Sequence, residues 1–197
     1  MHSWVKYGFF GGQVSLDFVN TVDDEGKTRE VNAIPDWKTV LTWALKAGIL
    51  SAKEAHSLTQ SVNEARIADE LDQLYAFRER LWSVLRNFAA GRAVDTEKAR
   101  AISNTIQWAV QKASIVQDVQ AFRWSVFQTE LGISLIRARL ALAVSDLITG
   151  QDLRQLRECG RCTGLFLHHG RGLGRRWCRM NTCGNRAKIE RFRSKSE

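Results

Sequence analysis

Four cysteines carry the clearest chemistry in the sequence, and all of them lie in one 25-residue span near the C-terminus. Two residues separate Cys159 from Cys162, four separate Cys178 from Cys183, and 15 lie between the pairs. Two thiolate pairs at such spacing favour a tetrahedral Zn²⁺ site, and a site closed by four ligands is structural. In a reducing compartment metal binding is favoured over disulfides. An iron–sulfur cluster and a redox disulfide remain the alternatives.

The residues around these cysteines predict a knuckle, a hairpin and a terminal helix, in an order similar to a treble clef. We expect residues 165–167 to form one strand, 170–174 a loop and 175–177 the returning strand. Cys183 is expected at the start of a helix, where the helix dipole stabilises a thiolate.

The helix expected after Cys183 has an apolar arc between two basic flanks. At about 100° per residue, Asn185, Ile189 and Phe192 share the arc, which is predicted to face the metal. The Asn185 amide would then brace the site from behind its ligands. Basic flanks can neutralise phosphates, although solubilising charges would give the same pattern. The predicted nucleic-acid contacts are Arg175, Arg176, Arg179, Arg186, Lys188, Arg191 and Arg193.

The net charge of +8 belongs entirely to the C-terminal quarter of the chain. Residues 151–197 hold 12 Lys and Arg against 4 Asp and Glu, whereas residues 1–150 hold 17 of each kind. A neutral body joined to a basic segment indicates a polyanionic partner, nucleic acid first. We therefore predict a helical domain over 1–150, with an effector or dimerisation role, and a four-cysteine finger over 151–197.

The first 150 residues predict a mainly α-helical, multihelical body with a small β-hairpin. Asp36, the pair Ser51 and Glu54, and Thr96 are the predicted helix starts. Charges within the most apolar stretch argue against a membrane span, and we expect a cytoplasmic protein. The expected elements are helices over 36–47, 67–90, 96–110 and 129–148, a further helix from 51, and a strand or short hairpin within 115–127.

Three polar residues interrupt the apolar pattern of this body. Arg78 falls within the apolar stripe of the longest helix, so it is either paired or at a rim. Asp17 and Asn20 lie in a segment that fits a strand or a helix equally well. For both, capping and hydrogen bonding beneath the helices are favoured over a direct functional role.

At these motifs the sequence resembles the CGNR zinc-finger family of bacterial proteins, described as stress-induced transcription regulators. The N-terminal stretches 11–21 and 37–50 resemble the ABATE domain that precedes the finger in that family. The resemblance implies a helical body, a Zn²⁺ finger, and a role in DNA binding and transcription. The finger motif comprises Cys159, Cys162, Phe166, residues 175–178, Met180, and the run Cys183, Gly184, Asn185 and Arg186. The family usually carries an acidic residue shortly after the Phe, where this chain has His168 and His169.

The sequence is also compatible with functions other than DNA binding. The finger could dock an acidic protein or a structured RNA, and a homodimer is open because transcription proteins often read DNA as symmetric dimers. A small-molecule-binding or enzymatic helical domain is the less favoured alternative, because the body shows no nucleophile–base pair, phosphate loop or carboxylate constellation. A histidine beside a zinc hairpin is also similar to an HNH-type nuclease, but that site needs a helix-borne partner and only Asn185 is a candidate.

Overall fold

The computed structural model describes residues 4–5, 8–22, 27–60, 63–170 and 174–194 of the 197. Over these residues the protein is mainly α-helical, as predicted, and carries two antiparallel hairpins. The elements are α2 (Val14–Val19), α3 (Trp37–Lys46), α4 (Ala52–Gln60), α5 (Glu64–Ala89), α6 (Thr96–Gln111), β1 (Ser114–Gln117), β2 (Phe122–Ser125), α7 (Gln128–Leu131), α8 (Leu135–Thr149), β3 (Leu156–Glu158), β4 (Leu165–Leu167) and α9 (Asn185–Arg193).

Helix starts follow the capping chemistry of the sequence in two cases out of three. Asp36 accepts the Thr39 N–H at 2.8 Å and starts α3. Ser51 and Glu54 form a reciprocal capping box at the start of α4. The predicted Thr96 cap is wrong: Asp95 caps α6 by accepting two backbone N–H groups. Both residue types are good N-caps, and the carboxylate accepts two donors at once.

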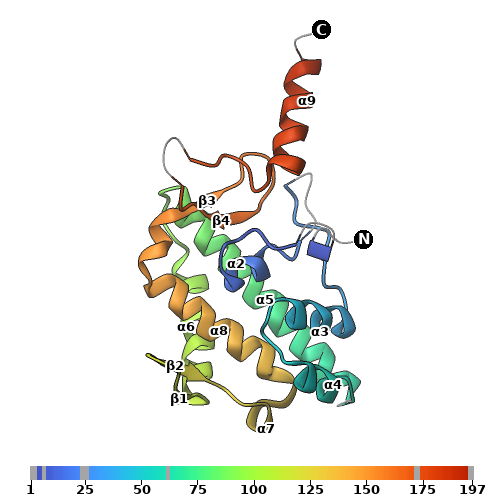
Figure 1. Ribbon diagram of the computed structural model, residues 1–197, viewed down its shortest axis with the longest axis vertical. Coiled ribbons are helices and arrows are strands. Elements are labelled where there is room, and N and C mark those ends of the chain that lie inside the picture. The colour runs from blue at the N-terminus through green and yellow to red at the C-terminus, as the bar shows by residue number, and fades with distance from the viewer. Residues whose placement is uncertain (1–3, 6–7, 23–26, 61–62, 171–173, 195–197) are drawn as a thin grey trace.

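Helix α8 forms the centre of the body and is buried on several sides, as its all-round apolar sequence predicts. Figure 1 shows α8 and α5 running side by side, with α6 packed against them. The single helix predicted over 129–148 is interrupted, because Gly132 has a φ of +52° and separates α7 from α8. In the core, the Phe18 ring contacts the rings of Trp43 and Phe77, and all three side chains are fully buried.

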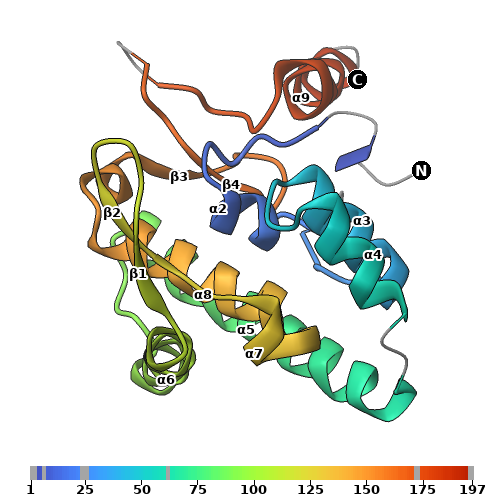
Figure 2. The ribbon, with the colours of Figure 1, turned by 60° about the horizontal axis from the view of Figure 1, so that its bottom comes forward.

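The hairpin expected within 115–127 is present as β1 and β2, with Ser114 opposite Ser125 and Gln117 opposite Phe122. In the view of Figure 2 this hairpin lies in front of α6 and α8. Arg78 is buried and paired: its guanidinium donates to Thr21, Asn32 and Glu79. A buried cation needs such partners, so this arginine ties three segments of the core together.

The C-terminal segment joins the body through the same hydrophobic core. Leu156, Leu165 and Leu167 of the β3–β4 hairpin belong to the main apolar cluster of the helices. A second, smaller cluster surrounds the cysteines. Figure 1 shows α9 projecting away from the rest of the molecule, at the end opposite the β1–β2 hairpin. No helix within the described ranges is long and apolar enough to cross a membrane.

Candidate metal centre and its basic surface

The four cysteines converge on one small volume. Their sulfurs all lie within 4.8 Å of one another, and each residue is at most 9% exposed. Cys178 Sγ lies 3.7 Å from Cys162 Sγ and 3.5 Å from Cys183 Sγ. Four sulfurs bound at about 2.3 Å to a tetrahedral Zn²⁺ stand roughly 3.8 Å apart, whereas a disulfide requires about 2.05 Å. The donor set therefore fits a zinc ion, and none of the four is in a disulfide.

The backbone around the sulfurs stabilises their ionised form. Gly164 donates its N–H to Cys162 Sγ at 3.4 Å, and Cys178 donates its N–H to Cys159 Sγ at 3.3 Å. The neighbouring Cys162 thiol lowers the pKa of Cys159, while the Cys159 contact and burial raise the pKa of Cys162. Four thiolates this close repel one another, so a divalent cation is the group that would let all four ionise.

The first cysteine pair lies on the turn that connects β3 to β4, and this corrects the predicted hairpin. Strand β4 pairs with the upstream strand β3, with Leu156 opposite Leu167. Residues 175–177 form no strand; Arg176 O only accepts the Gly160 N–H at 3.0 Å. Within the predicted loop, residues 171–173 lie outside the described chain. Apolar burial explains this pairing, because Leu156 of β3 joins Leu165 and Leu167 of β4 in the core of the helical body.

The second pair is brought in by an irregular helical turn. Cys178 precedes it, and Cys183 lies within a π-helical turn, Met180–Gly184, that continues into α9. Aromatic rings enclose the cluster: Phe10 from the N-terminal segment, with Phe166 and Trp177. Glycine at 164 is required by this packing, because a Cβ there would lie 2.9 Å from the Phe10 ring.

Long-range hydrogen bonds fasten the finger to the helices. The Asn20 side chain donates to Leu165 O at 2.7 Å and accepts the Leu165 N–H at 2.9 Å. Trp82 donates its indole N–H to Thr163 O at 3.0 Å. Arg29 contacts the Thr163 hydroxyl while pairing with a body carboxylate. The sequence indicated a hydrogen-bonding role for Asn20 but held no signal for the Trp82 and Arg29 contacts.

Arg179 does not belong to the solvent-facing surface predicted for it. It is half-buried, donates to Gly8 O, and its guanidinium lies 4.7 Å from the centre of the Phe10 ring. Burial lowers the pKa of Arg179, while coulombic attraction to an ionised Cys178 and to Asp17 favours its charged form. A zinc ion with four thiolates carries a net charge of −2, so this cation is placed to offset it.

Asp17 lies near Arg179, beside the cysteine cluster. It has the hydrogen-bonding role that the sequence favoured. Its carboxylate accepts the N–H groups of Phe10 and Gly11 at 3.0 and 2.8 Å. Burial raises the pKa of Asp17, and these two backbone hydrogen bonds oppose that effect. The carboxylate therefore shapes the N-terminal segment that packs against the finger.

The inward orientation predicted for Asn185 is wrong. Asn185 is exposed and donates weakly to Asn181 O at 3.5 Å, while Ile189 and Phe192 are 52% and 75% exposed. Instead Ala187 is buried, and Glu190 pairs with Arg161 on the same side. The π-helical turn before α9 changes which side of α9 faces the finger. The small side chain of Ala187 allows this side to approach the finger closely.

The other predicted basic contacts lie on the surface of the finger. Arg175 donates to Phe10 O and lies 4.0 Å from the Phe166 ring centre, whereas Arg176 lies over Trp177. Both remain exposed. The exposed basic side chains of α9 are Arg186, Lys188, Arg191 and Arg193.

The two histidines stand apart from the cysteine cluster. His168 is half-buried and accepts the Arg175 N–H through Nδ1 at 3.4 Å. His169 is exposed, and its Nδ1 lies 3.9 Å from Asp152. In the described residues, the group of metal-capable side chains that come together holds the four cysteines and neither histidine.

Fold and metal centre together define a mainly helical protein with a four-cysteine metal-binding finger. Residues 12–151 match the ABATE family, described as "Putative stress-induced transcription regulator", and residues 155–196 match the CGNR zinc finger. The chain belongs to the ABATE family and carries the CGNR finger, so Zn²⁺ is its cofactor. Neither is an enzyme family. No curated protein matches the chain.

Proposed function

We propose that this protein is a DNA-binding transcription regulator in which zinc holds a basic surface in place. Cys159, Cys162, Cys178 and Cys183 are the four proposed ligands. Their sulfur geometry closes the shell, which leaves no position for a catalytic water and supports a non-catalytic role. Reduced cysteines in a zinc site fit a reducing compartment, and we place the protein in the cytoplasm.

The observation that carries DNA binding is the position of the charge. The whole excess of +8 lies in residues 151–197, and α9 projects away from the body with its cations exposed. We assign phosphate contacts to Arg175, Arg176, Arg186, Lys188, Arg191 and Arg193. Arg179 is left out because, unlike the exposed Arg175, it is half-buried against the N-terminal segment. We therefore assign DNA contact to residues 151–197 and the regulatory role to residues 1–150.

The exposed face of α9 offers chemistry that could read bases. An exposed Asn amide can pair with adenine in the major groove, and an apolar side chain can contact a thymine methyl group. Asn185 and Ile189 are four positions apart, so they lie on one side of the helix. We therefore assign recognition of DNA bases to the α9 face of Asn185 and Ile189, which the sequence predicted to face the metal.

The test is DNA affinity as a function of salt, measured by fluorescence anisotropy on the zinc-loaded full-length chain with a random-sequence duplex. Each neutralised phosphate contributes about 0.9 to the slope of log K against log salt. Lys188→Ala should lower that slope by about 0.9, and Lys53→Ala, on exposed α4, should leave it unchanged. Affinity that does not vary with salt would refute phosphate binding. Selection from random DNA sequences then compares Asn185→Ala with the parent protein, and the variant should lose its preference for particular base sequences.

A second candidate is docking on another macromolecule, and the exposed apolar side chains favour a protein. Met180, in the turn before α9, is 66% exposed, and Ile189 and Phe192, on α9, are 52% and 75% exposed, so this end of the molecule presents large apolar side chains to solvent. An acidic protein surface with an apolar centre would complement them. Copurifying material that nuclease treatment removes supports nucleic acid. Material that resists nuclease and is released by Phe192→Ser supports the adaptor.

A further inference from the structure

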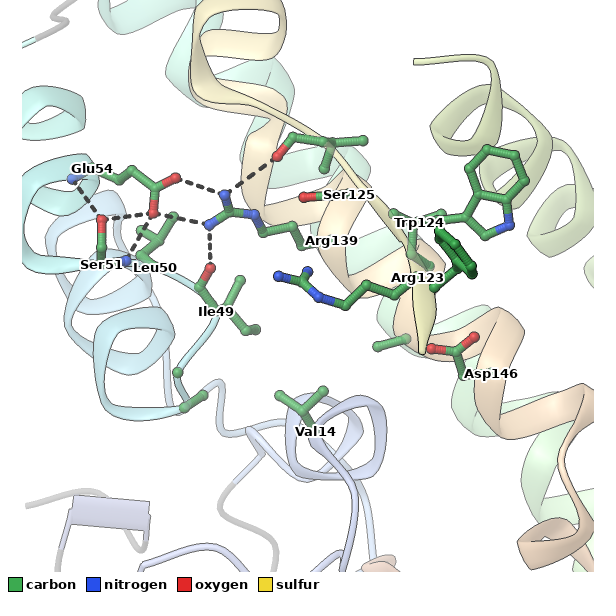
Figure 3. Close-up of a pocket in the computed structure, with 16 residues that line it drawn as sticks. Val14, Ile49, Leu50, Ser51, Glu54, Arg123, Trp124, Ser125, Arg139 and Asp146 are labelled. Carbon is green, nitrogen blue, oxygen red and sulfur yellow. Dashed lines mark hydrogen bonds and ion pairs between the residues drawn. The ribbon is translucent and has the colours of Figure 1, made fainter. Parts of the chain in front are cut away.

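A pocket in the helical body lies away from the finger and has no role in the function proposed above. It has a volume of about 750 Å³ and is lined by α2, the turn between α3 and α4, strand β2 and helix α8 (Figure 3). Pockets of this size accommodate metabolite-sized ligands. Its lining combines two arginines with apolar side chains, which include Val14, Ile49 and Leu142.

The first arginine, Arg139, shapes the wall of the pocket. Its guanidinium donates to Ile49 O at 2.5 Å, to both Glu54 carboxylate oxygens at 2.6 and 3.0 Å, and to Val126 O at 3.3 Å. The hydrogen bond from Arg139 lowers the pKa of Glu54 to about 2, so the carboxylate stays ionised and neutralises the arginine. Arg139 therefore joins the turn, the hairpin and α8.

Within the described residues, the charge of the second arginine, Arg123, is not neutralised by a close ion pair as that of Arg139 is. Side chains alternate along β2, and Figure 3 shows Arg123 extending into the pocket while Trp124 points away from it. The Arg123 ion pair with Asp118 is 3.8 Å long, and both side chains are 62% exposed. Such a pair contributes little. A guanidinium beside apolar walls is the arrangement that binds a carboxylate by two parallel hydrogen bonds.

Hydrogen bonds connect the pocket wall to the finger through α2. Ala143, which lines the pocket, accepts the Gln13 side-chain N–H at 2.9 Å. The same Gln13 side chain caps α2 by accepting the Ser15 N–H. At the far end of this six-residue helix, Asn20 holds both backbone groups of Leu165 in β4. These hydrogen bonds link the pocket wall, through one short helix, to the strand between the two cysteine pairs.

We propose that this pocket is an effector site for a small organic acid, bound through Arg123, and that α2 transmits its occupancy to the zinc finger. The carboxylate of the acid pairs with the guanidinium, and its aliphatic or aromatic part covers Val14 and Leu142. Asp146 faces the same space and would accept an N–H group from an amino acid-like ligand. Occupancy holds α2 against α8 and stabilises the finger.

The first experiment measures binding by isothermal titration to the zinc-loaded full-length protein. The probes are succinate, 2-oxoglutarate, glutamate and benzoate. At least one should bind with a Kd below about 1 mM, and Arg123→Gln should weaken it at least about tenfold, as expected for a charge-assisted pair. Arg92→Gln removes another exposed cation, outside the pocket, and should change Kd less than twofold. Failure of all four probes, or equal binding by Arg123→Gln, overturns the site.

The second experiment measures the rate of zinc release to a pyridine-based chelator, which has no carboxylate to compete for the pocket. The bound acid should slow release at least about threefold. Gln13→Asn keeps a capping oxygen but shortens the reach to Ala143, so it should retain the acid and lose the effect on zinc. An unchanged or faster release with the pocket occupied overturns the transmission. Neither readout involves DNA, so a failure here is distinct from a failure of the proposed DNA binding.

Discussion

Replacing Asn20 with alanine should loosen the zinc finger from the helical body. The Asn20 side chain is 7% exposed, and its two hydrogen bonds satisfy both the N–H and the C=O of Leu165. A buried backbone group left without a partner costs about 1–3 kcal/mol. We therefore expect Asn20→Ala to lower the free energy of unfolding by about 3 kcal/mol, a large part of the about 5–15 kcal/mol of an ordinary domain.

Urea unfolding of the zinc-loaded chain, followed by circular dichroism, measures this loss. With an m-value of about 2 kcal/mol/M, the midpoint should fall by about 1.5 M. Asn104→Ala, at an exposed site on α6, is the matched control and should stay within about 0.5 kcal/mol of the parent. Zinc release should also quicken in Asn20→Ala, because β4 precedes the second cysteine pair. A midpoint equal to that of the control would show that Asn20 does not anchor the finger.

Three further predictions concern charge and metal. Glu70→Ala should lower the unfolding free energy by about 3–5 kcal/mol in urea, because it leaves the mostly buried Arg137 unpaired; a loss under 1 kcal/mol would contradict this. The depressed pKa of Glu54 contributes stability above its unfolded pKa, and that contribution disappears as pH falls from about 4.5 to about 2. The stability gap between Glu54→Gln and the parent should therefore close across this window, and a constant gap would reject the Arg139 pairing. Zinc removal should make the finger protease-sensitive and also reduce the stability of the body, since the hairpin shares its core; an unchanged urea midpoint would show that the body stands alone.

Features that depend on neighbours along the chain were predictable from the sequence. The cysteine spacing, the reciprocal cap of Ser51 and Glu54, and the alternation over 115–127 each act within a few residues, so their geometry follows from local chain reach. The concentration of charge in residues 151–197 is likewise a property of the sequence alone. The zinc site and the mainly helical fold followed from these patterns.

Features that depend on distant partners were decided by the tertiary structure. Strand β4 pairs with β3 because Leu156 and Leu167 together complete the body core. Asn20 meets Leu165 across 145 positions, which no local pattern encodes.

The inward face of α9 also depended on packing, in this case between Ala187 and the finger. An apolar arc on a helix indicates that the side chains on one side are less polar than those on the other. Only the surface that a helix meets decides which side is buried, and here the apolar side was left to solvent.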